Sequence, residues 1–286
     1  MKTPILKVED LNISYPNKKR PIVENGFFEV YSGEIVLILG ENGTGKSSIF
    51  KSLVGDIEQD LISLFKNKIK KFLKNPFSKN DSKVEISKTM YLDGSLINND
   101  NQDIFRKKIG YVRQHDDDDS FFQKRVWNYV LDYVSHSYYY SNYSDQDKFK
   151  KIESDAQELY DKLDCQTYAD GNLKKLKLKH LSGGEKRMTT LLSALSRKHS
   201  RLFIMDEPVN NLDGYHARKL NNYLVDLKKE ENAPGILIIT HCPMFTNVDR
   251  VYRLINGKLI LDESEYKFQT CFGEVDSNGK YYIEEE

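Results

Sequence analysis

A glycine-rich run that ends in a lysine and a serine is the first place in this chain where chemistry can be expected. Its residues are Gly40-Glu41-Asn42-Gly43-Thr44-Gly45-Lys46-Ser47. The run fits the phosphate-binding pattern G-x-x-x-x-G-K-[ST], in which glycines let backbone N–H groups approach an anion closely. In this pattern Lys46 reaches the β- and γ-phosphates of a nucleotide and Ser47 places its hydroxyl on Mg²⁺. Ser48 is the next hydroxyl within reach of phosphate.

Two predicted elements flank this phosphate-binding run. The nearly continuous apolar segment Glu34–Leu39 is typical of a buried parallel strand, and residues 47–54 are predicted to form a helix. The N-terminus of such a helix attracts anions. An ordinary glycine turn between strand and helix is the alternative, but it does not require a lysine and a serine in register.

A pair of adjacent carboxylates follows a second apolar run. Asp206 and Glu207 come directly after residues 201–205, at the carboxyl end of a predicted strand. Ligands of open α/β sheets bind at that end. Asp206 is suited to hold Mg²⁺, mostly through water, because Mg²⁺ takes few carboxylates. Glu207 is suited to polarise an attacking water. Two solvated loop carboxylates are the alternative, which the position after a strand disfavours.

A third run, Leu181-Ser182-Gly183-Gly184-Glu185, points to a known family. With it, the chain resembles the ATP-binding cassette (ABC) ATPases from about Tyr15 to His241. The resemblance implies a dimer in which each ATP lies between the phosphate-binding run of one subunit and Ser182, Gly183 and Gly184 of the other. A helix predicted from about Glu185 would add a second N-terminus that attracts anions. Ser182 also fits a capping box with Glu185, and the two roles are compatible.

The resemblance assigns roles to further single positions. Tyr15 matches the aromatic residue that stacks on adenine, and Gln114 matches the glutamine that meets Mg²⁺ and the attacking water. Asp213 is the acid of the dimer-contact loop 210–213. His241, which directly follows a predicted strand at 235–240, matches the histidine that senses the γ-phosphate. Glu207, His241 and Gln114 are therefore the expected catalytic residues, in a site that uses ATP and Mg²⁺. No motif is disabled, so hydrolysis is expected.

The full set of binding residues follows from these matches. The expected ATP-binding residues are Tyr15, Asn42, Gly43, Thr44, Gly45, Lys46, Ser47, Ser48, Ser182, Gly183, Gly184 and Asp213. The expected Mg²⁺ ligands are Ser47, Gln114 and Asp206, partly through water.

The expected fold is α/β, a P-loop NTPase of ABC type. The resemblance implies a parallel-sheet core, an N-terminal antiparallel β subdomain that includes Leu6–Tyr15 and Phe27–Tyr31, and a helical lobe over about 121–180. We expect residues 1–265 to form the nucleotide-binding domain and residues 266–286 a small C-terminal extension. Within that extension, residues 276–279 are of types that favour a turn, and they lie between two short predicted strands.

The composition of the chain limits which partners and which cellular compartment can be expected. The 43 basic and 43 acidic residues give a net charge of zero, which argues against nucleic acid as a partner. The sequence shows no signal peptide and no apolar run near the roughly 20 residues of a membrane-spanning helix. Cys165, Cys242 and Cys271 have no metal-binding spacing, which fits a reducing cytoplasm. We therefore expect a cytoplasmic protein, peripheral on the inner face of the cell membrane.

An inserted segment at about 56–82 departs from the family pattern. Leu61, Phe65, Ile69 and Phe72 repeat at helical spacing, and lysines fall mostly on the other side. Such a basic amphipathic helix can bind an anionic membrane or a partner's groove, or simply pack on its own cassette.

Two further departures follow along the chain. The acidic run 116–119 would suit a basic partner helix, a weakly bound cation or solvent, and the tyrosine-rich stretch 137–143 is either a partner surface or a loop packed on itself.

These observations favour an ATPase subunit of an ABC transporter. It would work as a dimer with itself or with a homologous cassette, alongside a separate multi-span membrane subunit. By analogy alone the direction is export. The alternative is a soluble ABC ATPase that acts on ribosomes, on nucleic acid or in cellular defence. A nucleotide-gated scaffold without hydrolysis is disfavoured because Glu207 and His241 are both present.

Overall fold

The computed structural model describes most of the cassette but leaves out several segments. The described residues are 3–15, 18–54, 85–98, 100, 101, 105, 107–114, 123–135, 145–268 and 272–283. The predicted insert at 56–82, the acidic run at 116–119 and the tyrosine-rich stretch at 137–143 lie outside them. In the described ranges, no helix is both long enough and apolar enough to cross a membrane.

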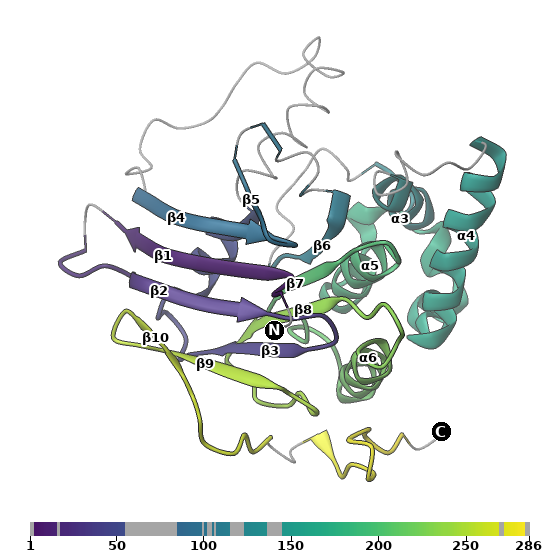
Figure 1. The fold of residues 1–286 in the computed structure, drawn as a ribbon. Coiled ribbons are helices and arrows are strands. Elements are labelled where there is room, and N and C mark those ends of the chain that lie inside the picture. The colour runs from purple at the N-terminus through teal and green to yellow at the C-terminus, as the bar shows by residue number, and fades with distance from the viewer. Residues whose placement is uncertain are drawn as a thin grey trace.

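Two sheets form the framework of the fold (Figure 1). The central sheet has the strand order β10-β9-β3-β8-β7-β6, in which β9, β3, β8, β7 and β6 pair in parallel and β10 adds an antiparallel edge. Its strands are β3 (Ile35–Leu39), β6 (Ile109–Val112), β7 (Leu202–Asp206), β8 (Gly235–Thr240), β9 (Arg250–Ile255) and β10 (Lys258–Leu261).

Hydrophobic burial explains why these segments become central strands. Every residue of β3, β7 and β8 is buried, as expected of parallel strands covered on both faces. The predicted strands at 34–39, 201–205 and 235–240 are confirmed to within one residue at each end. Asn256 and Gly257 both have positive φ between β9 and β10, the conformation of a tight hairpin turn.

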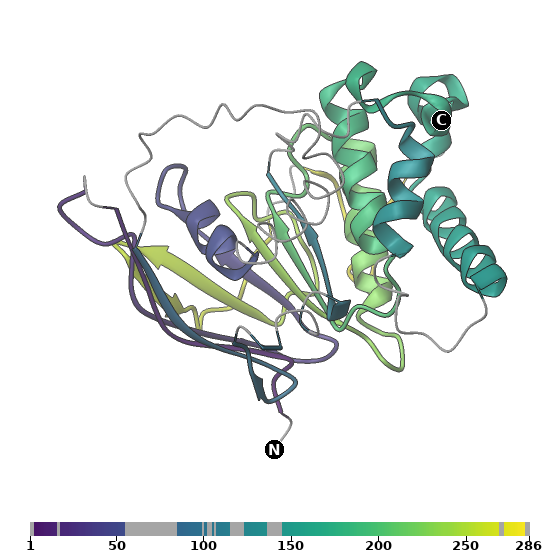
Figure 2. The same ribbon diagram turned by 90° about the horizontal axis from the view of Figure 1, so that it is seen from above.

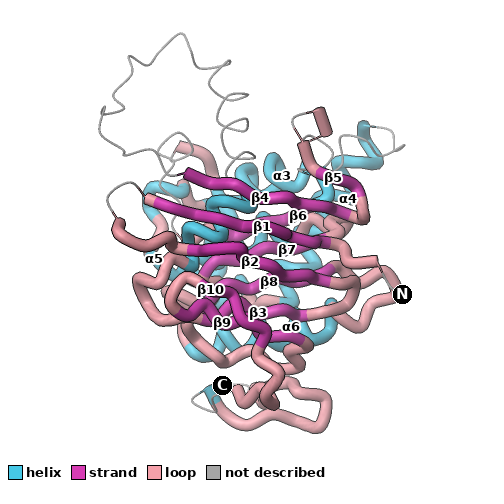
Figure 3. The backbone as a smooth tube through the Cα atoms, turned by 60° about the vertical axis from the view of Figure 1, so that its left-hand side comes forward, coloured by secondary structure: helices cyan, strands magenta, loops and turns pink. Residues whose placement is uncertain are grey.

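The antiparallel sheet lies beside the central sheet and has the order β2-β1-β4-β5. Figure 3 shows its strands running across the face of the molecule. The first predicted N-terminal strand is confirmed to within one residue as β1 (Leu6–Ser14). The second is present as β2 (Val23–Val30), which begins four residues before the predicted Phe27 and ends one residue before Tyr31. We did not predict β4 (Glu85–Leu92), which pairs with β1, or the short β5 (Ser95–Leu96). The predicted α/β fold with an antiparallel subdomain is therefore confirmed.

Helices cover both faces of the central sheet. One hydrophobic core joins the antiparallel sheet, the central sheet and the helix over residues 46–54, which Figure 2 shows in purple between the two sheets. A second core joins the other face to the remaining helices. These are α3 (Val126–Ser135), α4 (Asp145–Lys162), α5 (Gly183–Leu195) and α6 (Gly214–Leu227), with short 3₁₀ turns at Cys165–Gly171, Leu173–Lys175 and Leu178–His180.

The C-terminal segment packs against α6. The expected turn at 276–279 is present, with the Asp276 carboxylate accepting hydrogen bonds from the N–H groups of Asn278 and Lys280. The expected pair of strands is reduced to a single bridge between Val275 and Tyr281. Side-chain contacts to α6 replace a longer ladder, because Asn222 exchanges two hydrogen bonds with the backbone of Tyr281.

Candidate functional site

The glycine-rich run lies between β3 and the helix over residues 46–54 and folds around its own lysine. Lys46 is 5% exposed, and its Nζ donates to the carbonyl oxygens of Gly40 (2.8 Å) and Glu41 (3.0 Å). Asn42 and Gly43 are exposed and Thr44 is half-buried, with the Thr44 hydroxyl bonded to the Glu41 carbonyl. The loop is thus shaped by the lysine that the pattern assigns to phosphate.

Gly45 is required by both conformation and space. Its φ is +105°, in the region that favours glycine, and a Cβ there would lie 2.0 Å from Cγ2 of Ile22. Gly43 also has a positive φ, +81°, but a Cβ at that position would meet nothing within 4 Å. The run therefore packs tightly on one side and is open on the other.

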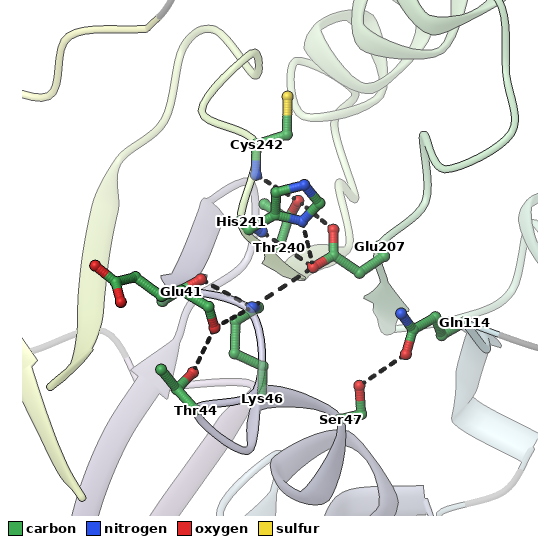
Figure 4. A network of polar contacts seen from close by, with 10 residues as sticks. Glu41, Thr44, Lys46, Ser47, Gln114, Glu207, Thr240, His241 and Cys242 are labelled. Carbon is green, nitrogen blue, oxygen red and sulfur yellow. Dashed lines mark hydrogen bonds and ion pairs between the residues drawn. The ribbon is translucent and has the colours of Figure 1, made fainter. Parts of the chain in front are cut away.

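Two hydroxyls at the start of the helix join the run to other elements. The Ser47 hydroxyl donates to Oε1 of Gln114 at 3.0 Å, which connects the helix to the segment after β6 (Figure 4). Oγ of Ser48 lies 3.0 Å from the hydroxyl of Tyr15 at the end of β1. The structure therefore brings Tyr15, Ser47, Ser48 and Gln114 together from three separate parts of the chain.

Glu207 is the centre of a dense polar network (Figure 4). Its carboxylate is buried and accepts from the Thr240 hydroxyl (2.8 Å) and from the backbone N–H of His241 (3.1 Å), and it lies 2.8 Å from His241 Nδ1. Lys46 Nζ is 3.7 Å away. The φ of Glu207 is 48°, which is strained for a residue with a side chain. Such strain persists only where the surroundings over-determine it, and this network does so.

Asp206 has a buried oxygen that is not paired. The residue is 1% exposed, and within the described part of the chain its Oδ1 has no hydrogen-bond partner. Burial raises the pKa of Asp206 to about 6; the Ser47 hydroxyl and the charge of Lys46 counteract this rise, and the charge of Glu207 adds to it. An orphaned carboxylate oxygen beside the Ser47 hydroxyl is the kind of donor set that a hard divalent cation takes, so these residues fit Mg²⁺.

The Ser182–Gly184 loop begins α5. Helix α5 begins at Gly183, two residues before the predicted start, and Ser182 is its N-cap. The Ser182 hydroxyl accepts from the Glu185 N–H, and the Glu185 carboxylate accepts from the Ser182 N–H at 2.7 Å, so the expected capping box is confirmed. In the described part of the chain, no hydrogen bond or ion pair joins this loop to the glycine-rich run. The two halves expected around ATP are thus separate within one chain.

The loop of residues 210–213 lies directly against this helix start. A Cβ added to Gly184 would come within 3.0 Å of the Asn211 carbonyl oxygen. Asp213 caps α6, accepting from the His216 N–H at 2.9 Å and pairing with His216 Nδ1 at 2.7 Å. Burial acts to raise the pKa of Asp213, but the hydrogen bonds from His216 outweigh it and lower that pKa.

Two residues of this region were not found from sequence. Thr240 is the last residue of β8, and its hydroxyl orients Glu207. Arg187 of α5 donates to the backbone carbonyls of Gln114 and Asn210. A signal for Arg187 exists, because it shares helical spacing with the buried Leu191 and Ala194 and so falls on the buried face.

Fold and site together define a P-loop protein in which two adjacent carboxylates, Asp206 and Glu207, stand at the carboxyl end of the parallel strand β7. The family comparison identifies it further. Residues 23–210 match the family model described as ABC transporter. The chain belongs to this family, as its Ser182–Gly184 loop indicates, and it is a cassette that binds and hydrolyses ATP.

Individual relatives agree with this assignment. The chain is 28% identical to a putative ABC transporter ATP-binding protein of Bacillus cereus, covering 92% of this chain but only 39% of that protein. It is 26% identical to the energy-coupling factor transporter ATP-binding protein EcfA of Methanosphaera stadtmanae, covering 90% of this chain and 78% of the relative. A bacterial ABC transporter cassette solved as a dimer has the same fold, with a TM-score of 0.64 at 18% identity, covering 89% of this chain and 96% of that one.

Proposed function

We propose that this chain is the ATP-hydrolysing subunit of a membrane transporter and that two cassettes enclose ATP between them. The observation that carries the proposal is the fixed carboxylate of Glu207. It directly follows the parallel strand β7 and lies beside Lys46 and His241, where a water bound next to a γ-phosphate would meet it. The separate helix start at Ser182 supports the dimer, because the N–H groups of Gly183 and Gly184 have no hydrogen-bond partner in the described part of this chain, whereas those of Ser182 and Glu185 bond within the capping box.

The proposed roles follow the geometry. Lys46 gives up its bonds to the Gly40 and Glu41 carbonyls when phosphate enters, and the N–H groups of residues 42–48 then face the anion. The Tyr15 ring stacks on adenine. Glu207 and Gln114 orient the attacking water, and His241 donates to the γ-phosphate. In the other subunit, Ser182, Gly183 and Gly184 bind that phosphate, and Asp213 lies in the contact between subunits.

We also propose that the site holds a magnesium ion, which its residues fit. Ser47, Gln114 and Asp206 would hold it, with Asp206 acting through its unpaired oxygen. Bound there, Mg²⁺ would neutralise charge that develops on the phosphates. The protein groups themselves contribute positioning and fixed charges, which account for most of the catalysis in phosphoryl transfer.

The domain division and the location are also proposed. We propose a cassette over residues 1–265, with a helical lobe at about 121–180 and the insert at 56–82, followed by the extension 266–286. The cassette would dock on a multi-span membrane subunit at the inner face of the cell membrane. Export stays our expectation by analogy. The similarity to EcfA favours a second candidate, a cassette of an energy-coupling factor transporter.

The test uses Glu207→Gln, which keeps the size of the side chain but cannot polarise water. With saturating MgATP, sedimentation should show a stable dimer, and turnover should fall by on the order of 100-fold or more. Lys46→Ala is the control and should neither bind ATP productively nor dimerise. A strictly monomeric Glu207→Gln protein that binds MgATP would contradict the dimer. A pull-down of the trapped form in mild detergent should bring down a multi-span membrane protein, whereas ribosomes or nucleic acid would favour the soluble alternative.

A further inference from the structure

Arg187 is a buried charge in the helix that starts at the Ser182–Gly184 loop. It lies one turn into α5 and is 5% exposed. A buried guanidinium is costly unless its N–H groups are hydrogen-bonded. The position of Arg187 is therefore set by the groups that accept from it, and these groups belong to other parts of the site.

Three backbone carbonyls on two loops accept hydrogen bonds from this side chain. Nη2 donates to the Gln114 carbonyl at 2.6 Å, Nη1 donates to the Arg113 carbonyl, and Nε donates to the Asn210 carbonyl at 3.2 Å. The first two carbonyls follow β6, and the third follows β7. The planar fork of an arginine can span such a set of acceptors, whereas the single ammonium of a lysine is a compact point charge.

Both loops carry residues of the proposed site. The side chain of Gln114 accepts from the Ser47 hydroxyl, so the backbone that Arg187 holds also sets the glutamine against the glycine-rich run. Asn210 begins the loop that ends at Asp213, and this loop packs on Gly184. One side chain therefore connects the start of α5 to a loop that serves this chain's own nucleotide and to a loop that faces a second subunit.

We propose that Arg187 is a positioning residue that ties the Ser182–Gly184 end of α5 to Gln114 and to the 210–213 loop. The inference rests on the proposed function, because it assigns Gln114 and Asp213 to ATP hydrolysis. A movement of α5 that follows binding of the other subunit's nucleotide is carried through the guanidinium to both loops. ATP affinity itself depends on the glycine-rich run, and the three carbonyls that accept from Arg187 belong to other segments.

The test compares Arg187→Lys with Arg197→Lys. Arg197 is also 5% exposed, follows the same helix and donates to the Lys107 carbonyl, so it is a matched buried arginine at the other end of α5. Arg187→Lys should lower kcat by about ten- to a hundredfold while the Kd for ATP stays within about twofold, because a small misplacement of catalytic groups costs rate rather than binding. Amide hydrogen exchange at residues 110–114 and 209–213 should become about tenfold faster in Arg187→Lys alone.

The outcomes separate this inference from the proposed function. Unchanged kcat and unchanged exchange in Arg187→Lys, or equal losses in both arginine variants that follow their loss of stability, would overturn the role of Arg187. A wild-type protein without ATPase activity would overturn the proposed function, while the exchange comparison would still test the positioning. If Arg187→Lys does not fold, Arg187→Gln provides the same comparison with the same expected and contrary results.

Discussion

The Thr240 hydroxyl donates a 2.8 Å hydrogen bond to Oε2 of Glu207, and both residues are buried. The remaining oxygen, Oε1, faces His241. Thr240 therefore holds one oxygen of the proposed catalytic carboxylate, while His241 and Lys46 contact the other. The positive φ of Glu207 is a strained backbone conformation, which persists only where surrounding contacts such as these hold the residue in place.

Replacing Thr240 tests this arrangement. Thr240→Val keeps the shape but removes the donor, so the carboxylate loses a fixed direction. We expect kcat for ATP hydrolysis to fall by about tenfold or more, with the Kd for ATP unchanged within about twofold. Thr240→Ser retains the hydroxyl and should restore most of the rate. Equal activity in the valine and serine variants would show that the hydroxyl does not position Glu207.

The raised pKa of Asp206 predicts a pH-dependent stability. The folded carboxyl titrates at about 6, above its ordinary value of 3.8, so the folded state holds the extra proton between these values. The free energy of unfolding therefore falls as pH rises through this window. Asp206→Asn has no such ionisation. Near pH 4 the two proteins should be about equally stable, and at pH 7 the variant should be more stable by about 2–3 kcal/mol.

Urea unfolding of nucleotide-free protein in a chelator measures this difference. Other carboxylates titrate in both proteins and cancel when the two are subtracted. A difference in stability that stays constant between pH 4 and pH 7 would mean that Asp206 is not forced to ionise in a buried setting. Added Mg²⁺ at pH 7 should stabilise the wild type more than Asp206→Asn, since a cation binding the folded state adds to its stability.

Two glycines of the phosphate-binding run allow the cost of backbone strain to be separated from the cost of overpacking. Both Gly43 and Gly45 have positive φ, but only at Gly45 would a methyl group collide, 2.0 Å from Ile22. Gly43→Ala should cost about 1–2 kcal/mol from backbone strain alone. Gly45→Ala should cost on the order of 1–3 kcal/mol more through overpacking. Thermal unfolding without nucleotide measures both, and equal losses in the two variants would contradict the packing at Ile22.

Buried strands and sequence motifs were predictable because their signals are local. The apolar run at 235–240 is confirmed as β8 over the same residues, and residues 201–205 agree with β7 to within one residue. The Asn256–Gly257 turn carried an equally local signal that we did not use. By contrast, β4 pairs with β1 across a long separation, and only its last residues, such as Met90 and Leu92, have buried side chains.

Side-chain contacts between segments far apart in the chain could not be predicted from the sequence. The resemblance places Gln114, Asp206 and His241 in one site, but it does not indicate that Thr240 orients Glu207 or that Arg187 bonds two loops. Those contacts depend on rotamers and on helix rotation, which pattern alone does not set. The early start of α5 has the same origin, because Gly183 and Gly184 are weak helix formers that the Ser182–Glu185 capping box stabilises.

Tyr281 anchors the C-terminal segment to the part of the chain that follows His241. Tyr281 is 3% exposed, and its hydroxyl donates at 2.5 Å to the Met244 carbonyl, three residues after His241. Tyr281→Phe leaves that buried carbonyl without this donor and should lower the free energy of unfolding by about 1–3 kcal/mol. Its neighbour Tyr282 is 63% exposed, so Tyr282→Phe is a matched control expected to change stability by less than about 0.5 kcal/mol. Equal stability of the two variants in urea would mean that the extension does not support the segment after His241.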